Sequence, residues 1–273
     1  MDRRAFLRRT LAGGAALGVS GVGAMALAQG GVRITHHDLP HAQMPLLPAG
    51  RRLRVAQLTD IHVGWGTSAE TLRTAQVQAR LVRPDLLVLT GDYLNHSLSE
   101  IDTLRAWVRG LPRPCIATLG NHDHWSGAPD IRRMLEQEGI PVLSNESTVL
   151  NVAGQPLRIV GVEDGFTHRD DVEAAFRDVP RPEEALVLSH DPKTADKIAK
   201  TGARVVLSGH THGGQFDIPG LTAAIATAAG IRYLKGWYMI DDMRLYVNCG
   251  IGSSVAAGRN GAASSELAVF EIG

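Results

Sequence analysis

Short hydrophobic runs alternate with segments of helical periodicity along most of the chain. Each run has five or six residues and is closed by Gly, Asp, Asn or His, which is too short for a buried helix and predicts a buried strand. The predicted strands are Leu53–Leu58, Leu86–Thr90, Cys115–Leu119, Leu157–Val162, Ala185–Ser189 and Arg204–Ser208. Between them, apolar residues recur at helical spacing, several after a Ser or Asp cap. The predicted helices are Ser68–Val82, Ser99–Arg109, Pro129–Glu138, Asp171–Arg177 and Pro192–Lys200.

The end of the chain has a different pattern. Ile231–Ile240, Arg244–Asn248 and Glu266–Ile272 predict consecutive strands without helices between them. Alternating strands and helices followed by such strands predict an α/β fold with two sheets and helices outside them, an αββα sandwich. We expect one domain over residues 51–273. Residues 29–50 form a lead-in arm, whose histidines His36, His37 and His41 we expect to be solvated.

Charge and the N-terminal segment bear on location and partners. Lys+Arg and Asp+Glu are both 28 in 273 residues, so no basic excess points to nucleic acid as a partner. The segment Asp2–Arg8 resembles the twin-arginine export signature, and the apolar stretch Leu11–Ala28 ends in a small-residue cleavage pattern. We therefore expect residues 1–28 to be a twin-arginine signal, read by the export machinery, and the mature protein to be extracytoplasmic. The alternative is a retained membrane anchor, because about 18 apolar residues can span a bilayer.

Two cysteines are too few for a disulfide framework. In an oxidising compartment Cys115 and Cys249 could pair. We favour two buried thiols, because both lie in apolar runs and cysteine is among the most buried residue types.

The predicted strands share one chemical feature at their carboxyl ends. Five of them lead into Asp, Asn or His residues, and in an open α/β sheet such ends converge on one ligand site. The sequences concerned are Asp60-Ile61-His62, Gly91-Asp92, Gly120-Asn121-His122-Asp123, His190 and Gly209-His210-Thr211-His212-Gly213-Gly214. Hard oxygens with imidazole nitrogens suit Mn, Fe or Zn rather than Ca. The i, i+2 spacing within Asp60–His62 and His210–His212 predicts ligands on one side of an extended backbone.

This ordered set of motifs resembles the calcineurin-like metallophosphoesterase family from about Leu53 to Gly214. Together with the export signal, it resembles the exported or membrane-associated bacterial subgroup that acts on phosphodiesters or lipid-linked pyrophosphates. The resemblance implies two metal ions. One would be held by Asp60, His62 and His212, the other by Asn121, His190 and His210, and Asp92 would bridge them. His122 would face the scissile phosphate, and Asp123 would orient its ring.

The implied activity is hydrolysis of a P–O bond by a hydroxide that bridges the two ions, with a proton for the leaving group from His122. A phosphodiester or a lipid-linked phosphate or pyrophosphate is the expected substrate, with a possible contact to a membrane surface. A phosphomonoesterase or nucleotide hydrolase on the same scaffold is one alternative, and a binding scaffold without catalysis is another.

Departures from the family pattern leave some points open. Asn95 stands where purple acid phosphatases have a tyrosine ligand, Cys249 stands where relatives tend to have Arg, and Val255–Ser265 is short. Trp65 and Trp125 follow predicted ligands, and each either packs over the edge of the site or contacts substrate. The apolar segment Ile218–Trp237 either completes the core or forms a lip for a lipid.

Overall fold

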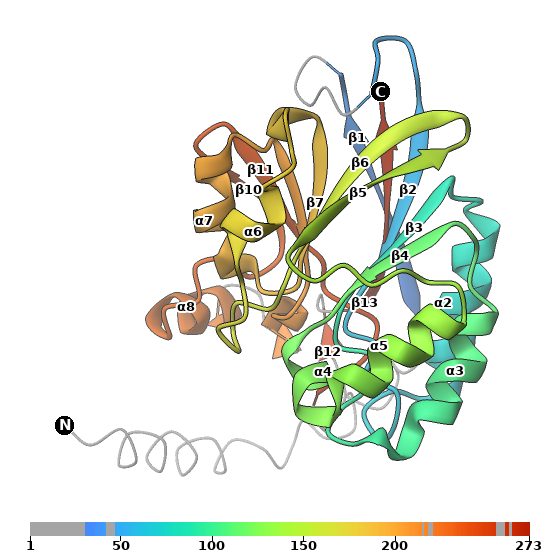
Figure 1. Ribbon diagram of the computed structural model, residues 1–273. Helices are drawn as coiled ribbons and strands as arrows, with labels where there is room; N and C mark the ends of the chain where they lie inside the picture. Colours follow the sequence, from blue (N-terminus) through green and yellow to red (C-terminus); the bar gives the residue numbers. More distant parts are fainter. Residues whose placement is uncertain (1–30, 42–46, 215, 218–220, 255–259, 262–263) are drawn as a thin grey trace.

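The computed structural model describes residues 31–41, 47–214, 216–217, 221–254, 260–261 and 264–273 (Figure 1). The predicted signal segment, residues 1–28, lies outside the described residues, as do parts of the segments 218–237 and 255–265. Within the described residues, no helix is long and apolar enough to span a membrane.

Two mixed β-sheets form the centre of the molecule. The order in the first sheet is β1 (Val32–Leu39), β13 (Ser265–Ile272), β2 (Leu53–Leu58), β3 (Leu86–Thr90) and β4 (Cys115–Thr118). The order in the second is β10 (Gly236–Ile240), β11 (Met243–Val247), β8 (Val205–Ser208), β7 (Ala185–Ser189), β6 (Gln155–Val162) and β5 (Glu146–Val152). Strands β2, β3 and β4 are parallel to one another, as are β6, β7, β8 and β11. A small third sheet pairs β9 (Phe216–Asp217) with β12 (Asn260–Gly261).

Helices cover the outer faces of both sheets (Figure 1). The α-helices are α2 (Ala69–Leu81), α3 (Ile101–Arg109), α4 (Asn121–Ser126), α5 (Ala128–Gln137), α6 (Val172–Phe176), α7 (Ala195–Ile198) and α8 (Leu221–Ala228). Short 3₁₀ turns lie at Leu98–Glu100, Pro182–Glu184, Pro192–Thr194, Ala199–Thr201 and His212–Gly214. Helices α2, α3 and α5 pack on the first sheet, and α6 and α7 pack on the second.

Alternating side chains on the strands build three hydrophobic layers. On β2, for example, Val55 faces the core between the sheets, whereas Ala56 and Leu58 face helices α2, α3 and α5. Because side chains alternate along a strand, a run that is buried on both faces is mostly apolar. The predicted αββα arrangement of an α/β fold with two sheets is confirmed.

The structure differs from the sequence-based prediction at several elements. Residues 32–39 of the predicted lead-in arm form β1, which pairs with β13 along its whole length. The ring of His37 is half-buried and packs on Tyr246 and Phe270, so the prediction of a solvated histidine is wrong there. Strand β10 takes up only the last part of the predicted strand Ile231–Ile240, and the predicted helix Pro192–Lys200 is divided into α7 and two 3₁₀ turns.

Candidate metal centre

The candidate ligands lie on the loops after β2, β3, β4, β7 and β8, where the carboxyl ends of the two sheets meet. Three of these strands belong to the first sheet and two to the second. The loops bring together all seven ligands that the sequence predicts.

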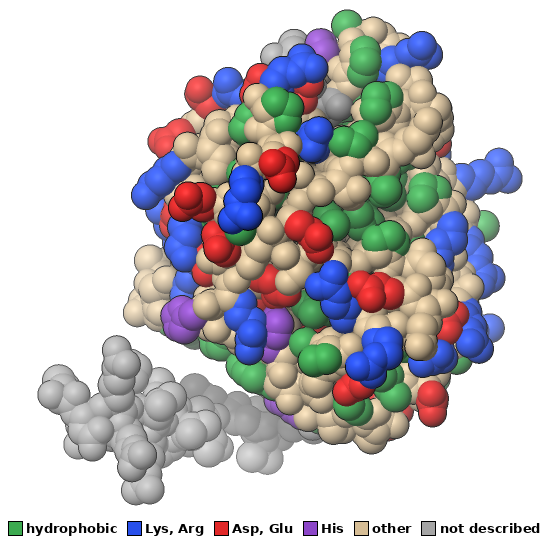
Figure 2. All heavy atoms as spheres, in the orientation of Figure 1, with side chains coloured by type: hydrophobic (Ala, Val, Ile, Leu, Met, Phe, Trp, Pro, Cys, Tyr) green, Lys and Arg blue, Asp and Glu red, His purple; other side chains and the backbone are tan. Residues whose placement is uncertain are grey.

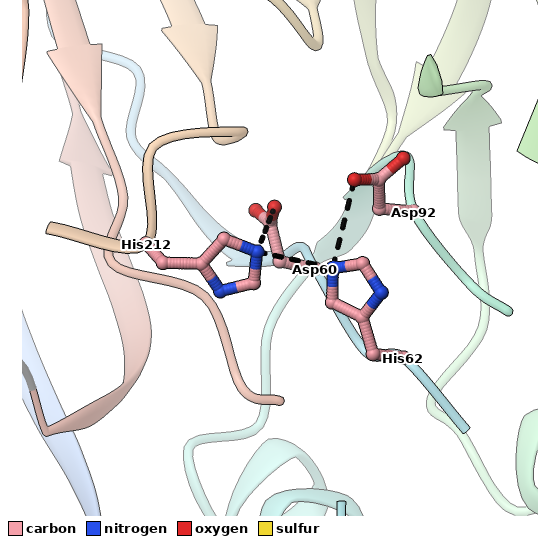
Figure 3. Close-up of side chains that lie close together, drawn as sticks. All are labelled: Asp60, His62, Asp92 and His212. Atoms are coloured by element: carbon pink, nitrogen blue, oxygen red, sulfur yellow. Dashed lines mark hydrogen bonds and ion pairs between the residues drawn. The ribbon is translucent and has the colours of Figure 1, made fainter. Parts of the chain in front are cut away.

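A first cluster consists of Asp60, His62, Asp92 and His212, all of them buried (Figure 3). His212 Nε2 lies 3.3 Å from Asp60 Oδ1 and 3.0 Å from His62 Nε2. His62 Nε2 lies 3.6 Å from Asp92 Oδ2. The potential ligand atoms of the four side chains all lie within 4.8 Å of one another. Two carboxylates and two imidazoles that turn their lone pairs toward one point fit a divalent metal ion.

A second cluster shares Asp92 with the first and adds His190 and His210. His190 Nε2 lies 3.1 Å from Asp92 Oδ2. The side-chain oxygen of Asn121 lies 2.9 Å from His210 Nδ1, so the amide belongs to the same cluster. One carboxylate common to two sets of ligand atoms is the arrangement that a dinuclear metal centre requires.

The backbone of the site is in an unusual conformation. Asp60, His62, Asp92, His210 and His212 have φ angles of 51°, 46°, 58°, 73° and 54°. Left-handed conformations are uncommon for residues other than glycine and gather at functional sites, where the surrounding fold offsets their cost. The expectation of extended Asp60–His62 and His210–His212 segments is therefore wrong. The tight turns place His210 and His212 in different clusters.

Glycine permits close packing around Asp60. Gly250 has φ 77°, and a Cβ atom there would lie 2.6 Å from Cβ of Asp60. The Asp60 carboxylate also accepts the backbone N–H of His210 at 3.0 Å and the hydroxyl of Thr59 at 2.8 Å. These contacts fix the position of Asp60.

Electrostatics differ between the two buried aspartates. Burial raises the pKa of Asp92, but the neighbouring His190, His62 and His122 outweigh this effect and lower the pKa well below its usual range. Burial and the charge of Asp92 leave the pKa of Asp60 raised, although the neighbouring His190 opposes them. Asp92 is thus the carboxylate that keeps its negative charge most readily, at the position shared by both clusters.

Backbone carbonyls orient the rings of three site histidines. His190 Nδ1 lies 2.7 Å from the carbonyl of Thr90, His212 Nδ1 lies 3.2 Å from that of Gly252, and His122 Nδ1 is bonded to that of Asn95. A hydrogen bond at one ring nitrogen fixes the orientation and leaves the other nitrogen for a ligand or a proton. These carbonyls could not be predicted from the sequence, because every residue type has one.

Asp123 does not orient the ring of His122 as the sequence analysis expected. Its carboxylate accepts the backbone N–H groups of Asp92, Tyr93 and Gly120 at 2.8, 2.8 and 2.9 Å. Burial and the charge of Asp92 raise the pKa of Asp123 to about 7, and these backbone donors oppose the rise. Asp123 therefore shapes the loop that carries Asp92. His122 itself lies beside the clusters, with its ring 4.7 Å from that of His62.

The two cysteines are buried thiols and form no disulfide. Burial raises the pKa of Cys115 to about 12, so this thiol stays protonated at neutral pH.

The fold and the paired clusters together define a metal-dependent phosphoesterase. The sequence profile of the calcineurin-like phosphoesterases matches residues 53–214, and the chain belongs to this family. The matched segment begins at β2 and ends two residues after His212, so it includes every predicted ligand.

Several curated proteins are similar along the chain. The uncharacterized metallophosphoesterase YkuE of Bacillus subtilis is 29% identical over 265 residues, which cover 92% of this chain and 91% of YkuE. The phosphodiesterase YaeI of Escherichia coli is 28% identical over 261 residues and 93% of each chain. The UDP-2,3-diacylglucosamine pyrophosphatase LpxG of Chlamydia trachomatis is 24% identical over 259 residues, 73% of this chain and 78% of LpxG.

A solved structure has the same fold. The 5'-nucleotidase precursor of Thermus thermophilus superimposes with a TM-score of 0.51 and 17% identity over 81% of this chain. The match covers 54% of that structure, so the chain spans about half its length.

Proposed function

We propose that this protein hydrolyses a phosphodiester or a lipid-linked phosphate or pyrophosphate outside the cytoplasm. The observation that carries the proposal is the position of Asp92, a buried carboxylate shared by two clusters of ligand atoms. Asp60, His62 and His212 would hold one ion, and Asn121, His190 and His210 would hold the other. Mn, Fe or Zn suits these ligands. When bound, such a pair supplies an activated water and positive charge for the phosphoryl oxygens.

The protein's own residues would supply a bridging charge and a proton for the leaving group. Asp92 would place a negative charge between the two cations and so lower their mutual repulsion. His122 lies beside His62 but outside both clusters, so its imidazole is available to the leaving group. The carbonyl of Asn95 accepts the Nδ1–H of that ring, so Nε2 is the nitrogen that would donate a proton to the departing oxygen, from the imidazolium form of the ring.

Helix α8 supports a lipid-linked substrate. Its Leu221 and Ile225 are 50% and 59% exposed, although both are large aliphatic residues. The helix starts close to the ligand loop, because the methyl group of Thr222 packs at Gly214, two residues after His212. An exposed apolar surface beside a phosphate site suits a substrate with an acyl chain. Among the relatives, LpxG is named for a diacylated substrate and YaeI for a diester.

The location outside the cytoplasm rests on the N-terminal sequence. Arg3 and Arg4 precede an uncharged stretch that ends in Ala26-Leu27-Ala28, as in signals of the twin-arginine route. This route carries folded proteins, which suits a protein that acquires metal before export.

Elemental analysis followed by a substrate panel tests the proposal. The purified protein should contain about two metal ions per chain. With each candidate metal, it should hydrolyse bis-p-nitrophenyl phosphate or a phospholipid faster than p-nitrophenyl phosphate or nucleotides. Faster hydrolysis of the monoesters would replace the proposed substrate class. Absence of bound metal and of any hydrolysis would contradict the catalytic role itself.

A further inference from the structure

Two exposed aromatic residues contact histidines of the candidate site and each other. Trp125 is 51% exposed, and its ring centroid lies 4.7 Å from that of His122. Phe166 is 48% exposed, and its ring lies 5.0 Å from that of His210. The two rings meet edge to face, with centroids 6.0 Å apart and planes at 77°. Together they link the loop after β4 of the first sheet to the loops after β6 and β8 of the second.

The protein fixes both rings in place. Trp125 lies on α4, one turn after His122, so the helix that carries His122 also sets the position of the indole. Phe166 follows Asp164, whose carboxylate accepts the N–H and the hydroxyl of Thr167 at 2.7 Å each. The loop of Phe166 is therefore closed by its own hydrogen bonds.

A buried hydrogen bond also joins the two loops. His124 Nε2 lies 2.8 Å from Glu163 Oε2, and Glu163 also accepts the hydroxyl of Ser144 at 2.6 Å. His124 precedes Trp125, and Glu163 lies three residues before Phe166. Both side chains are less than 10% exposed. The pair holds Trp125 and Phe166 at a fixed separation although each ring is half in water.

Exposed aromatic rings next to a phosphate site need a physical reason, because they leave apolar area in water. Figure 2 shows hydrophobic side chains beside histidines at the lower edge of the molecule, the region of α4 and α8 in Figure 1. Two rings at nearly a right angle present one flat face and one ring edge, which suits a planar ring that stacks on the first and meets the second edge-on. An acyl chain has no such preference, and the aliphatic residues Leu221 and Ile225 of α8 serve it elsewhere.

We propose that Trp125 and Phe166 form an aromatic clamp that binds a planar ring attached to the scissile phosphate, such as an aryl ester group. The clamp rests on the proposed function, because it needs the phosphoryl group to lie at the metal clusters. In this proposal the two aromatic residues determine specificity, and the residues of the candidate metal centre carry out the bond cleavage.

Binding of phosphonates that cannot be hydrolysed tests the clamp. The protein, loaded with the metal that supports its diesterase activity, is titrated with methylphosphonate, cyclohexylphosphonate and phenylphosphonate by calorimetry. All three present the same phosphoryl group, and the last two differ in whether the ring is planar. We expect phenylphosphonate to bind roughly 3- to 10-fold more tightly than the other two, the usual effect of aromatic stacking.

The variants Trp125→Leu and Phe166→Leu should each reduce that preference, and the double variant should abolish it, while the Kd of methylphosphonate stays unchanged. Both side chains are half-exposed, so leucine is tolerated at each, and metal content and thermal unfolding verify the fold. Trp65→Leu is the matched control. Trp65 is 59% exposed on the loop after His62, and no ring contact of the described residues includes it, so its replacement should leave the preference intact.

The outcomes distinguish failure of the clamp from failure of the proposed function. A phenyl preference that survives in the double variant overturns the clamp. So does equal binding of cyclohexylphosphonate and phenylphosphonate by the unchanged protein, because apolar area alone would then account for the affinity. Failure of the metal-loaded protein to bind methylphosphonate would instead contradict the phosphoester site, and the clamp with it.

Discussion

The contacts, the charge and the backbone conformation of Asp92 all serve the candidate metal site. Its Oδ2 faces His62 at 3.6 Å and His190 at 3.1 Å, while Oδ1 accepts the backbone N–H of His122 at 2.9 Å. A bridging carboxylate must stay ionised in a buried position, and the neighbouring histidines lower its pKa although burial raises it. The same residue also has a left-handed backbone conformation. An amide of the same shape would keep the packing and remove only the charge.

The change Asp92→Asn should therefore reduce the metal content to fewer than two ions per chain and remove nearly all activity. Elemental analysis and diester hydrolysis measure both effects. Asp130→Asn, at a half-exposed acid on α5 whose side chain is 47% exposed, is the control and should retain two ions. An Asp92→Asn protein that still holds two ions would refute the bridging role.

His122 tests the division between metal binding and proton transfer. The change His122→Ala should keep both ions and the fold, because neither cluster of ligand atoms includes this ring. Its rate should fall by a factor on the order of 10²–10⁴, the usual effect of a positioned acid or base. The loss should be smaller for nitrophenyl esters than for alkyl esters, because nitrophenolate leaves without a proton.

The control for this variant is His36→Ala, at an exposed histidine of β1. Loss of a metal ion from the His122→Ala protein would contradict the assignment. Equal impairment on alkyl and nitrophenyl esters would contradict it as well.

At this scale the sequence predicts which residues meet but not how they are oriented. The ligand types follow the ends of apolar runs, so their convergence could be inferred from the α/β pattern. The left-handed φ angles at Asp60 and His62 could not be inferred from the sequence, because they arise only when the whole fold imposes the turn. The bond of Asp123 to backbone N–H groups of another loop is likewise a tertiary contact without a local signal.

Elements buried on both faces were the most predictable. Strands β2, β3 and β7 have the predicted bounds, because each is a mostly apolar run in the interior of a sheet. Strands β1 and β5 lie at sheet edges and carry polar residues such as His36 and Asn151, so their sequences resemble those of loops. The pairing partner of β1 is β13, at the other end of the chain, and local periodicity does not reveal such a pair. Strand β5 instead pairs with the next strand, β6, but about half of its side chains face water.

Helix α8 allows a test of the lipid-linked substrate. The double change Leu221→Ser with Ile225→Ser should lower the partition of the protein onto phospholipid vesicles by roughly 10-fold or more, because two apolar side chains no longer enter the bilayer surface. Cleavage of bis-p-nitrophenyl phosphate should be unaffected. Vesicle sedimentation and kinetics measure the two effects. Both side chains are at least half-exposed, so the free energy of unfolding should change little.

Val77→Ser is the matched control for the helix, because Val77 is 44% exposed on α2. It should leave the partition unchanged. Loss of folding in the α8 variant would instead show that the helix completes the core.

At the scale of the whole molecule, the N-terminal segment determines where we expect the protein to act. If residues 1–28 are a twin-arginine signal, replacing Arg3 and Arg4 by lysine should leave full-length precursor in the cytoplasm, and the exported protein should begin near Gln29. Cell fractionation and N-terminal sequencing measure both. Replacing Arg8 and Arg9 by lysine is the control and should permit export. Normal export of the Arg3, Arg4 variant would reject this route.

A buried carboxylate, Glu266 of β13, joins the two sheets near the site. Its Oε1 accepts the hydroxyls of Thr35 on β1 at 2.7 Å and of Tyr246 on β11 at 2.6 Å. Its Oε2 accepts the backbone N–H of Cys249 at 2.9 Å, next to the glycine that packs on Asp60. Burial raises the pKa of Glu266, but these donors outweigh it and the pKa is lowered from the ordinary 4.5.

A carboxylate with a lowered pKa stabilises the fold fully above its unfolded pKa, and the contribution disappears as pH falls through the folded pKa. Glu266→Gln should thus reduce the free energy of unfolding by about 1–3 kcal/mol at pH 7, because an amide leaves a donor facing a donor. The difference between the two proteins should shrink as the pH falls well below 4.5. Urea unfolding in a chelating buffer measures this difference in the free energy of unfolding without a contribution from bound metal.

Glu70→Gln, at an exposed position of α2, should show no such difference. A deficit of Glu266→Gln that is the same at pH 7 and well below pH 4.5 would mean that the carboxylate joins the sheets through its shape and not through its charge.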